Sequence, residues 1–228
     1  MNSKISVKFE TSTPGMSIVV IELNNLHLTN SSKAFEEYEQ SLFEQIRSNN
    51  ILDDLGFEPL IKSYRSLHWT YGMDPTKKRV SSEAVLRRVL KGENLWRISN
   101  LVDVVNLASA YHKIPIGLID AAKTSGQLTL RQARQGEAFV RIGGEELVCR
   151  GRELVLADDV GIICYGFAIH DSDRTKVTKQ SQQVILLLYG APDTTRDIMD
   201  SATALTLNMV KQWVDCTASE PIRYLSPA

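Results

Sequence analysis

The sequence predicts an α+β fold, with helical segments in the first half of the chain and short strands in the second. Between residues 35 and 108, apolar residues recur at steps of three and four, the period of a helix with one buried face. After Pro115 the pattern changes to short β-like runs separated by glycines or by paired aspartates. No repeat or linker divides the chain, so we expect residues 1–228 to form one domain.

Four segments predict helices. The first starts near Ser31 or Ser32, and the second runs from Ser81 or Ser82, whose hydroxyl can cap it, to Gly92. The third spans about 100–111. A final helix, about 193–214, begins near an aspartate suited to an N-cap and is expected to pack on the rest of the fold.

Short apolar runs predict the strands. Residues 17–23 are rich in β-branched residues and predict the first buried strand. The later runs are 116–119, 127–130, 138–142, 146–149, 153–157, 161–168 and 183–189. Gly143-Gly144 lies between two of them and predicts a hairpin turn. Together they predict a multistranded sheet system, mainly antiparallel or mixed.

Composition and charge are those of an ordinary globular protein, with 43% hydrophobic residues and a net charge of −1. A net charge this close to zero argues against a broad nucleic-acid-binding surface. No run approaches the length of a membrane span, and the polar N-terminus lacks a signal-peptide core. We therefore expect a cytoplasmic protein with no membrane partner. The sequence carries no signal for an oligomeric state.

The common catalytic and metal-binding signatures are missing. The three cysteines are scattered, and Cys164 lies in an apolar run, so buried thiols are expected. The four histidines show no metal-binding spacing. GxSxG, GxxxxGK[ST] and GxGxxG motifs are also absent. We predict neither a metal nor a cofactor.

Charge is unevenly distributed. Residues 32–58 are strongly acidic, whereas residues 61–100 are basic. Either the two blocks neutralise each other or the basic block meets phosphates. In the second case the contacts come from Lys77, Lys78, Arg79, Arg87, Arg88 and Lys91.

Two polar clusters are candidates for a binding site. The first is Asn100, Asp103 and Asn106 on the flank of the helix at 100–111. These side chains either tether the helix to a loop or bind a ligand, since an amide is both donor and acceptor. The second is HDSDRTKVT at 170–178, which is either a solvated connection or a functional loop.

Three stretches, GMDPTKKRVSSEAVLRRVLKG, LVDVVNLASAYHKIPIGLID and SDRTKVT, together carry a family resemblance. Over residues 17–190 the chain resembles the B3/B4 domain of the phenylalanyl-tRNA synthetase β subunit, and most closely its free-standing members. The resemblance implies a three-layer ββα sandwich. In the synthetase this domain binds the tRNA acceptor end and removes wrongly attached tyrosine.

The resemblance also implies site residues. The synthetase pocket uses a Thr-Asn pair on the central helix and a histidine after its proline. Here Asn106 matches the asparagine, but Val105 and Gly117 replace the threonine and histidine. Asp171 or Asp173 is the nearest candidate for a glutamate of the synthetase site. These two replacements argue against removal of tyrosine, and they leave open a related pocket for another amino acid.

The leading hypothesis is a free-standing domain that binds an aminoacylated tRNA end or an amino acid and hydrolyses mischarged tRNA in trans. The alternative is a non-catalytic module on the same scaffold that binds an amino acid, RNA or protein. The chain is too short for a complete synthetase. The proposed catalytic residues are Asn106, Asp171 and Asp173. The proposed ligand-binding residues are Asn100, Asp103, Gly117, His170, Ser172, Arg174 and Thr175. One pocket between the 100–111 helix and the sheet is expected to join Asn106, Gly117 and the 170–176 loop.

Overall fold

The computed structural model describes residues 5–227 and confirms the α+β class. The helices are α1 (Lys33–Asn49), α2 (Pro59–Thr70), α3 (Ser81–Leu90), α4 (Asn100–His112) and α5 (Arg196–Trp213). The strands are β1 (Val7–Glu10), β2 (Ser17–His27), β3 (Ile116–Asp120), β4 (Leu128–Gln132), β5 (Gln135–Val140), β6 (Glu146–Arg150), β7 (Leu154–Ala157), β8 (Ile162–Tyr165), β9 (His170–Asp171), β10 (Val184–Gly190), β11 (Asp215–Ala218) and β12 (Ile222–Leu225).

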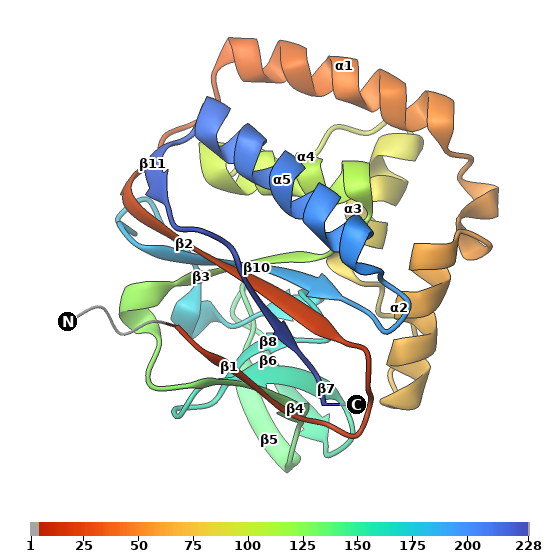
Figure 1. Cartoon of the computed structure of the whole chain (residues 1–228), viewed down its shortest axis with the longest axis vertical. Coiled ribbons are helices and arrows are strands. Elements are labelled where there is room, and N and C mark those ends of the chain that lie inside the picture. The colour runs from red at the N-terminus through yellow and green to blue at the C-terminus, as the bar shows by residue number, and fades with distance from the viewer. Residues whose placement is uncertain (1–4, 228) are drawn as a thin grey trace.

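The elements form two β layers and one helical layer (Figure 1). The central sheet is antiparallel, in the order β11-β2-β10-β3, and β12 also pairs with β2. The second sheet, β1-β4-β7-β8-β9, is mixed because β1 runs parallel to β4. Helices α4 and α5 cover the face of the central sheet that is turned away from the second sheet (Figure 1).

Strand β10 shows how the two faces of the central sheet differ. A side chain at Gly190 would meet Met199 of α5. Gly190 and every second residue before it in β10 therefore face the helices. Tyr189 points the other way and stacks on Phe167, with ring centroids 4.9 Å apart. Alternate residues of β10 therefore belong to two separate packing layers.

The helix boundaries agree in part with the sequence predictions. Ser32 caps α1 as expected, accepting from the amide of Phe35. At α3 the N-cap position is Val80, and no side chain caps it, so the predicted serine cap is wrong. At α5 the cap is Thr195 rather than the predicted aspartate. Helix α2 was not predicted at all.

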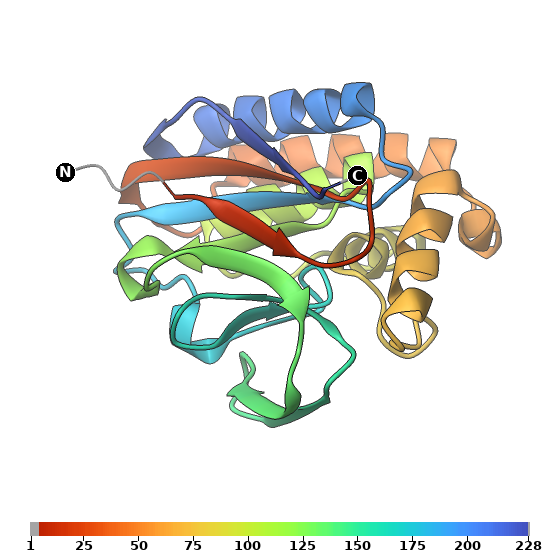
Figure 2. The same ribbon diagram turned by 60° about the horizontal axis from the view of Figure 1, so that its bottom comes forward.

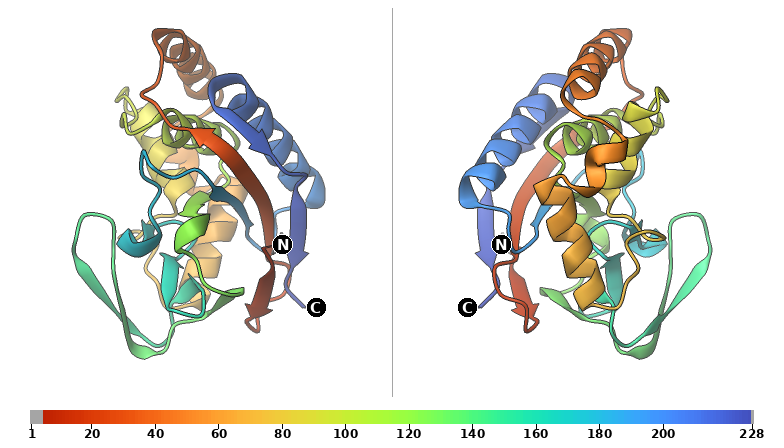
Figure 3. Two further views of the ribbon diagram at one scale, coloured as in Figure 1. Left: turned by 90° about the vertical axis from the view of Figure 1, so that its left-hand side faces the viewer. Right: turned by 90° about the vertical axis from the view of Figure 1, so that its right-hand side faces the viewer.

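Strands β5 and β6 form a separate hairpin that projects from the body of the protein (Figures 2 and 3). Its turn contains Gly143 and Gly144, as predicted, with φ values of 104° and 87°. Such values favour glycine. One continuous core of buried apolar side chains extends from Val7 to Val214 and includes Phe139 and Cys149 at the inner side of the hairpin. Within residues 5–227, no helix combines the length and apolarity that crossing a bilayer requires.

Candidate functional site

An open groove of about 370 Å³ beside α3 brings together residues that are distant in the sequence. All six side chains proposed for phosphate contacts line it. The lining residues are Lys77, Lys78, Arg79, Ala84, Arg87, Arg88, Lys91, Glu93, Trp96, Ile169 and His170. The basic block and the start of the polar 170–178 segment therefore share one concave surface.

A tight turn before α3 sets the position of the groove lysines. The carbonyl of Asp74 accepts from the amides of Lys77 and Lys78, at 3.1 and 2.8 Å. Its carboxylate accepts from the amide and hydroxyl of Thr76. The following helix then places Arg87 and Lys91 one turn apart on its outer side.

A buried carboxylate lies behind this basic surface. Glu83 is 1% exposed and pairs with Arg65 at 2.6 Å, Arg87 at 2.7 Å and Arg79 at 3.6 Å. Burial opposes ionisation, but hydrogen bonds from Arg65 and Arg87 hold the pKa of Glu83 below its ordinary value. This carboxylate fixes three guanidinium groups and partly neutralises the groove.

Two lysines keep their charge available to a ligand. The Lys77 side chain is 82% exposed, and its nearest carboxylate partner, Asp74, is 3.9 Å away. Lys91 is exposed and forms no ion pair within residues 5–227. The acidic block reaches the basic block through Arg97, which pairs with Glu36 and Glu39. Neutralisation between the blocks is therefore local and leaves Lys77 and Lys91 available to a ligand.

An exposed tryptophan borders the groove. Trp96 is 51% exposed, and the Arg88 guanidinium carbon lies 4.6 Å from its ring centroid. Arg88 is held in turn by the carboxylate of Glu93 at 2.6 Å and the carbonyl of Asn94 at 2.5 Å. The guanidinium covers part of the indole, and the exposed part can stack on an aromatic group of a ligand.

At the other end of the groove, Lys78 and His170 both lie beside Tyr165. The Lys78 ammonium donates to the Tyr165 hydroxyl at 3.0 Å and lies 4.6 Å from the ring centroid. His170 pairs with Tyr165 across β8 and β9, with ring centroids 6.1 Å apart. Burial lowers the pKa of Lys78 and of His170, and the charges of Arg141 and Lys78 lower that of His170 further.

A strained turn places His170 in the groove. Gly166, Phe167 and Ala168 all have left-handed φ values, of 60°, 55° and 60°. Two consecutive non-glycine residues in this region are uncommon and cost free energy. The turn is fixed by packing, because Phe167 stacks on Tyr189 and also meets Tyr64 edge-on. The residues after it, Ile169 and His170, line the groove.

Behind the groove lies a closed polar cluster of Cys164, Asp171 and Tyr189. Cys164 and Asp171 are cross-strand partners in β8 and β9. Asp171 keeps part of its surface exposed, but desolvation of its carboxyl group raises its pKa to about 6. Burial also raises the pKa values of Cys164 and Tyr189. The Tyr189 hydroxyl is buried and has no hydrogen-bond partner within the described residues.

Gly117 adjoins this cluster and has no open space beside it. A Cβ atom there would lie 2.8 Å from the Tyr189 hydroxyl and 3.1 Å from its ring. Gly117 pairs with Leu187 of β10, so its missing side chain would point toward the second sheet. The expectation that this glycine leaves room for a ligand therefore differs from the structure, in which the Tyr189 ring occupies that room.

Asn106 is not brought into the same cavity. It lies on α4, which covers the opposite face of the central sheet from Tyr189 and the second sheet (Figure 1). Its side chain is half-buried and makes no hydrogen bond within residues 5–227. The structure thus differs from the expected pocket between the helix and the sheet, because the sheet separates Asn106 from the space beside Gly117.

The other two polar residues of α4 hold its N-terminus in place. The Asn100 side chain accepts from the amides of Thr29 and Leu101 and donates to the carbonyl of His27. Asp103 accepts from the Ser31 hydroxyl at 2.7 Å and from the amide of Ile98. Both side chains have the tether role that was the alternative to ligand binding.

The polar loop after His170 is also largely occupied with internal contacts. Arg174 makes two hydrogen bonds to Asp158, at 2.7 and 3.0 Å. Ser172 accepts from the amide of Arg174, and Asp173 accepts from Lys176. Thr175 is 2% exposed. His170 is the member of this loop that lines the basic groove.

Asp171→Asn should change the pH dependence of stability. Because the pKa of Asp171 is raised, the folded state holds its proton more tightly, and wild-type stability falls as pH rises from about 4 to 6. An amide does not titrate, so the stability of the variant relative to the wild type should increase over this interval. Urea unfolding at pH 4, 5, 6 and 8 measures the difference, with Asp193→Asn as the exposed control. A difference that stays constant with pH would contradict the assignment.

Three residues of this region were not predicted from the sequence: Trp96, Tyr165 and Tyr189. Both tyrosines lie in apolar strand runs, where an aromatic residue normally indicates core packing. Trp96 follows the basic helix in a polar segment, KGENLW, and that context was the available signal. Within the described residues, no group of three or more histidine, cysteine or acidic side chains is placed to hold a metal ion.

Fold and groove define an α+β domain with a basic concave site. Residues 63–209 match the family described as the B3/4 domain, and the chain belongs to this family. It is 32% identical over 103 residues to the phenylalanine–tRNA ligase beta subunit of Chromobacterium violaceum, covering 45% of this chain and 13% of that protein. For the same subunit of Fusobacterium nucleatum, the identity is 26% over 112 residues, covering 49% and 14%.

These curated relatives are much longer than the present chain, which spans about one seventh of their length. Among solved structures, an N-terminal fragment of the phenylalanyl-tRNA synthetase beta subunit from Pyrococcus horikoshii is similar, with a TM-score of 0.49 and 13% identity. The similarity covers 97% of this chain and 54% of that chain.

Proposed function

We propose that this protein binds the aminoacylated end of a tRNA, with the RNA backbone in the basic groove. The observation that carries the proposal is the convergence of six cationic side chains and an exposed indole on one concave surface. Lysine and arginine bind phosphates, and unpaired bases stack on aromatic rings, so this combination suits a single-stranded RNA end. The names of the relatives support tRNA as the RNA. A tRNA partner also supports a cytoplasmic location.

The groove offers different chemistry at its two ends. Lys91 and Trp96 follow the C-terminal end of α3, where bases and phosphates would bind. His170 and Lys78 lie near β9, where an ester group at the end of the RNA would be placed. This polarity supports an aminoacylated end in preference to an internal stretch of RNA.

A second candidate is a non-catalytic binding module on the same scaffold. It is favoured by the closed packing at Gly117, where Tyr189 fills the space that an amino acid side chain would need. Deacylation of mischarged tRNA separates the two functions. A binding module should leave the half-life of every aminoacyl ester at its uncatalysed value, whereas a hydrolase should shorten at least one.

Lys77→Ala combined with Lys91→Ala should weaken binding of all tRNAs to a similar degree. Each exposed lysine is expected to neutralise one phosphate, and each lost contact lowers the slope of log K against log salt by about 0.7 for single-stranded RNA. Arg87 is less suitable for this test because its pairing with Glu83 also supports the fold. Binding at several salt concentrations measures the slope.

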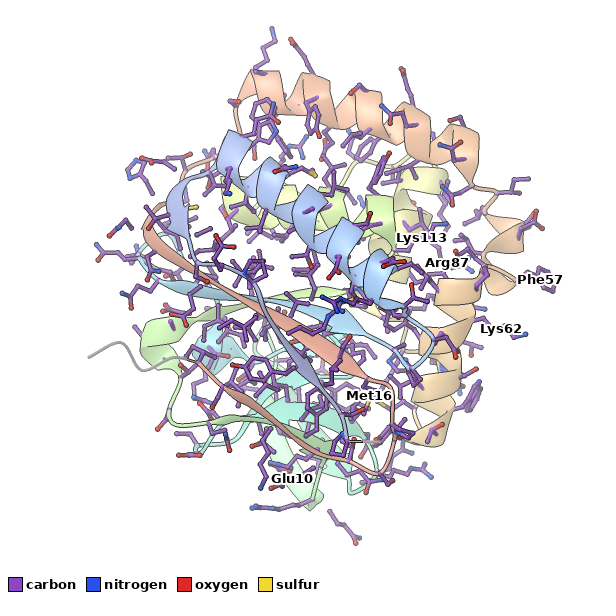
Figure 4. The ribbon with its side chains drawn as sticks, viewed as in Figure 1. Glu10, Met16, Phe57, Lys62, Arg87 and Lys113 are labelled. Atoms are coloured by element: carbon purple, nitrogen blue, oxygen red, sulfur yellow. The ribbon has the colours of Figure 1, made fainter. Side chains whose placement is uncertain are left out.

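The matched control is Lys62→Ala combined with Lys211→Ala. Lys62 projects outward from α2 (Figure 4), and both control lysines are exposed positions outside the groove. The control removes the same net charge, so it separates local contacts from a general electrostatic effect. Equal affinities and slopes for the groove variant and the control would remove RNA from this groove.

A further inference from the structure

We propose that the β9 end of the groove is a hydrolytic centre, in which the His170 imidazole activates water and the Lys78 ammonium stabilises the resulting oxyanion. The inference rests on the proposed function, because its substrate is the ester between an amino acid and the bound RNA end. It assigns the chemistry to residues on the groove surface, away from Asn106 and Gly117.

Tyr165 fixes the geometry of the two groups. It is fully buried in β8 and cannot move without disturbing the core. Its hydroxyl accepts a hydrogen bond from the Lys78 ammonium at 3.0 Å. The same ammonium lies 4.6 Å from the centroid of its ring. Its cross-strand partner is His170. Both functional groups therefore lie beside one rigid side chain, although they come from segments 92 residues apart.

The His170 ring is free to act as a base. It is half-buried, lines the groove and makes no side-chain hydrogen bond within residues 5–227. The charged groups around it are Lys78 before α3, and Arg141 and Glu145 at the tip of the β5–β6 hairpin. Burial and the two cations lower its pKa, so the imidazole is neutral at pH 7 and can accept a proton.

The reaction balances with these groups alone. Water transfers one proton to His170 while its oxygen forms a bond to the ester carbonyl carbon. The carbonyl oxygen becomes an oxyanion, which the Lys78 ammonium stabilises. The intermediate then releases the ribose oxygen, which takes the proton from His170. The products are a free amino acid and an RNA end with its hydroxyl restored.

The closed cluster behind the groove is unsuited to this role. The thiol of Cys164 is buried, and its raised pKa keeps it protonated, so it is a poor nucleophile. Tyr189 is also buried and occupies the space beside Gly117. Among the polar groups of this region, His170 combines a basic nitrogen with access to the groove.

The test uses the full chain and a panel of tRNAs, each charged with one of the twenty amino acids. Single-turnover deacylation with excess protein gives the rate at saturation, and filter binding gives Kd separately. The wild type should hydrolyse at least one ester at more than 10 times the uncatalysed rate. His170→Asn should slow this by about 100-fold or more at saturation, so that the loss is in the rate of hydrolysis and is not explained by Kd. His170→Gln provides a second variant, and His27→Asn is the exposed histidine control.

Lys78 and pH provide two further readouts. Lys78→Met should slow hydrolysis by about 100-fold at saturation, and Lys78→Arg should restore part of the rate because it keeps the positive charge. After subtraction of uncatalysed hydrolysis, the wild-type rate should rise with pH through the lowered pKa of His170 and then reach a plateau. The His170 variants should lack this rise.

The possible outcomes separate the inference from the proposed function. If tRNA binds but no ester is hydrolysed faster than in buffer, the hydrolytic centre is overturned and the binding function stands. Full hydrolysis by folded His170 variants also overturns it and places the chemistry elsewhere. If no tRNA binds, the proposed function itself fails.

Discussion

Gly117→His is expected to destabilise the protein severely. Even a Cβ atom at this position lies 2.8 Å from the Tyr189 hydroxyl, a separation that requires the ring to move. That ring is fully buried and stacked on Phe167, so it has little freedom to move. Overpacking of this kind typically costs about 1–3 kcal/mol, and an imidazole adds more volume than a methyl group. Gly117→Ala should fall within that range, with the histidine variant beyond it.

Urea denaturation of Gly117→Ala and Gly117→His measures these costs. Gly56→Ala is the matched control, because its backbone is also outside the left-handed region and its nearest neighbour is the flexible end of Arg65. Combining Gly117→Ala with Tyr189→Phe removes the closest atom and should recover part of the loss. Full stability of the Gly117→His single variant would show that Tyr189 yields, and that a synthetase-like histidine can be restored by one substitution.

Glu83→Gln should cost about 3 kcal/mol of folding free energy. Removing one partner of a buried ion pair leaves charge without compensation and typically costs 3–5 kcal/mol. The lower end applies here because Arg65, Arg79 and Arg87 retain 25%, 42% and 24% exposure and can reach water. The pKa of Glu83 is lowered, so its contribution is present at neutral pH and is lost as the carboxylate is protonated in acid.

The same substitution should act on the groove in the opposite direction. It removes the carboxylate that partly neutralises Arg79 and Arg87, so tRNA affinity should rise while stability falls. Thermal or urea unfolding and tRNA binding on one preparation measure both effects. Glu37→Gln, at an exposed position on α1, removes one carboxylate without touching the groove. Equal stability of the two variants would mean that Glu83 is dispensable.

Local patterns in the sequence predicted the helices well where the apolar period is regular. In α4, Leu101, Val104 and Ala108 recur on one side, and all three are buried. Helix α2 was missed although Pro59 is at its start and the Glu58 side chain caps it. The edge strands β11 and β12 were missed because they are defined by pairing with β2, about 200 residues earlier.

In the candidate site, too, local features were predictable from the sequence and long-range contacts were not. The basic face of α3 was predictable because charge and helical period are local properties. The role of Gly117 was not, since it depends on Tyr189, a residue 72 positions later whose ring direction follows from strand register. For Arg174 the sequence indicates a polar side chain but does not reveal Asp158 as its partner. Composition identifies polar residues, whereas tertiary contacts decide which of them remain free for a ligand.

The pairing of β2 has a consequence for synthesis of the protein on the ribosome. This long apolar strand is made before its neighbours β10, β11 and β12, which all follow residue 183. Until they emerge, the backbone of β2 has no partner and its buried residues, such as Ile18 and Ile21, lack their final packing. Pairing across so many residues slows folding and prolongs exposure of an aggregation-prone strand. The sheet that contains β2 can therefore be completed only after residues 184–225 have been made.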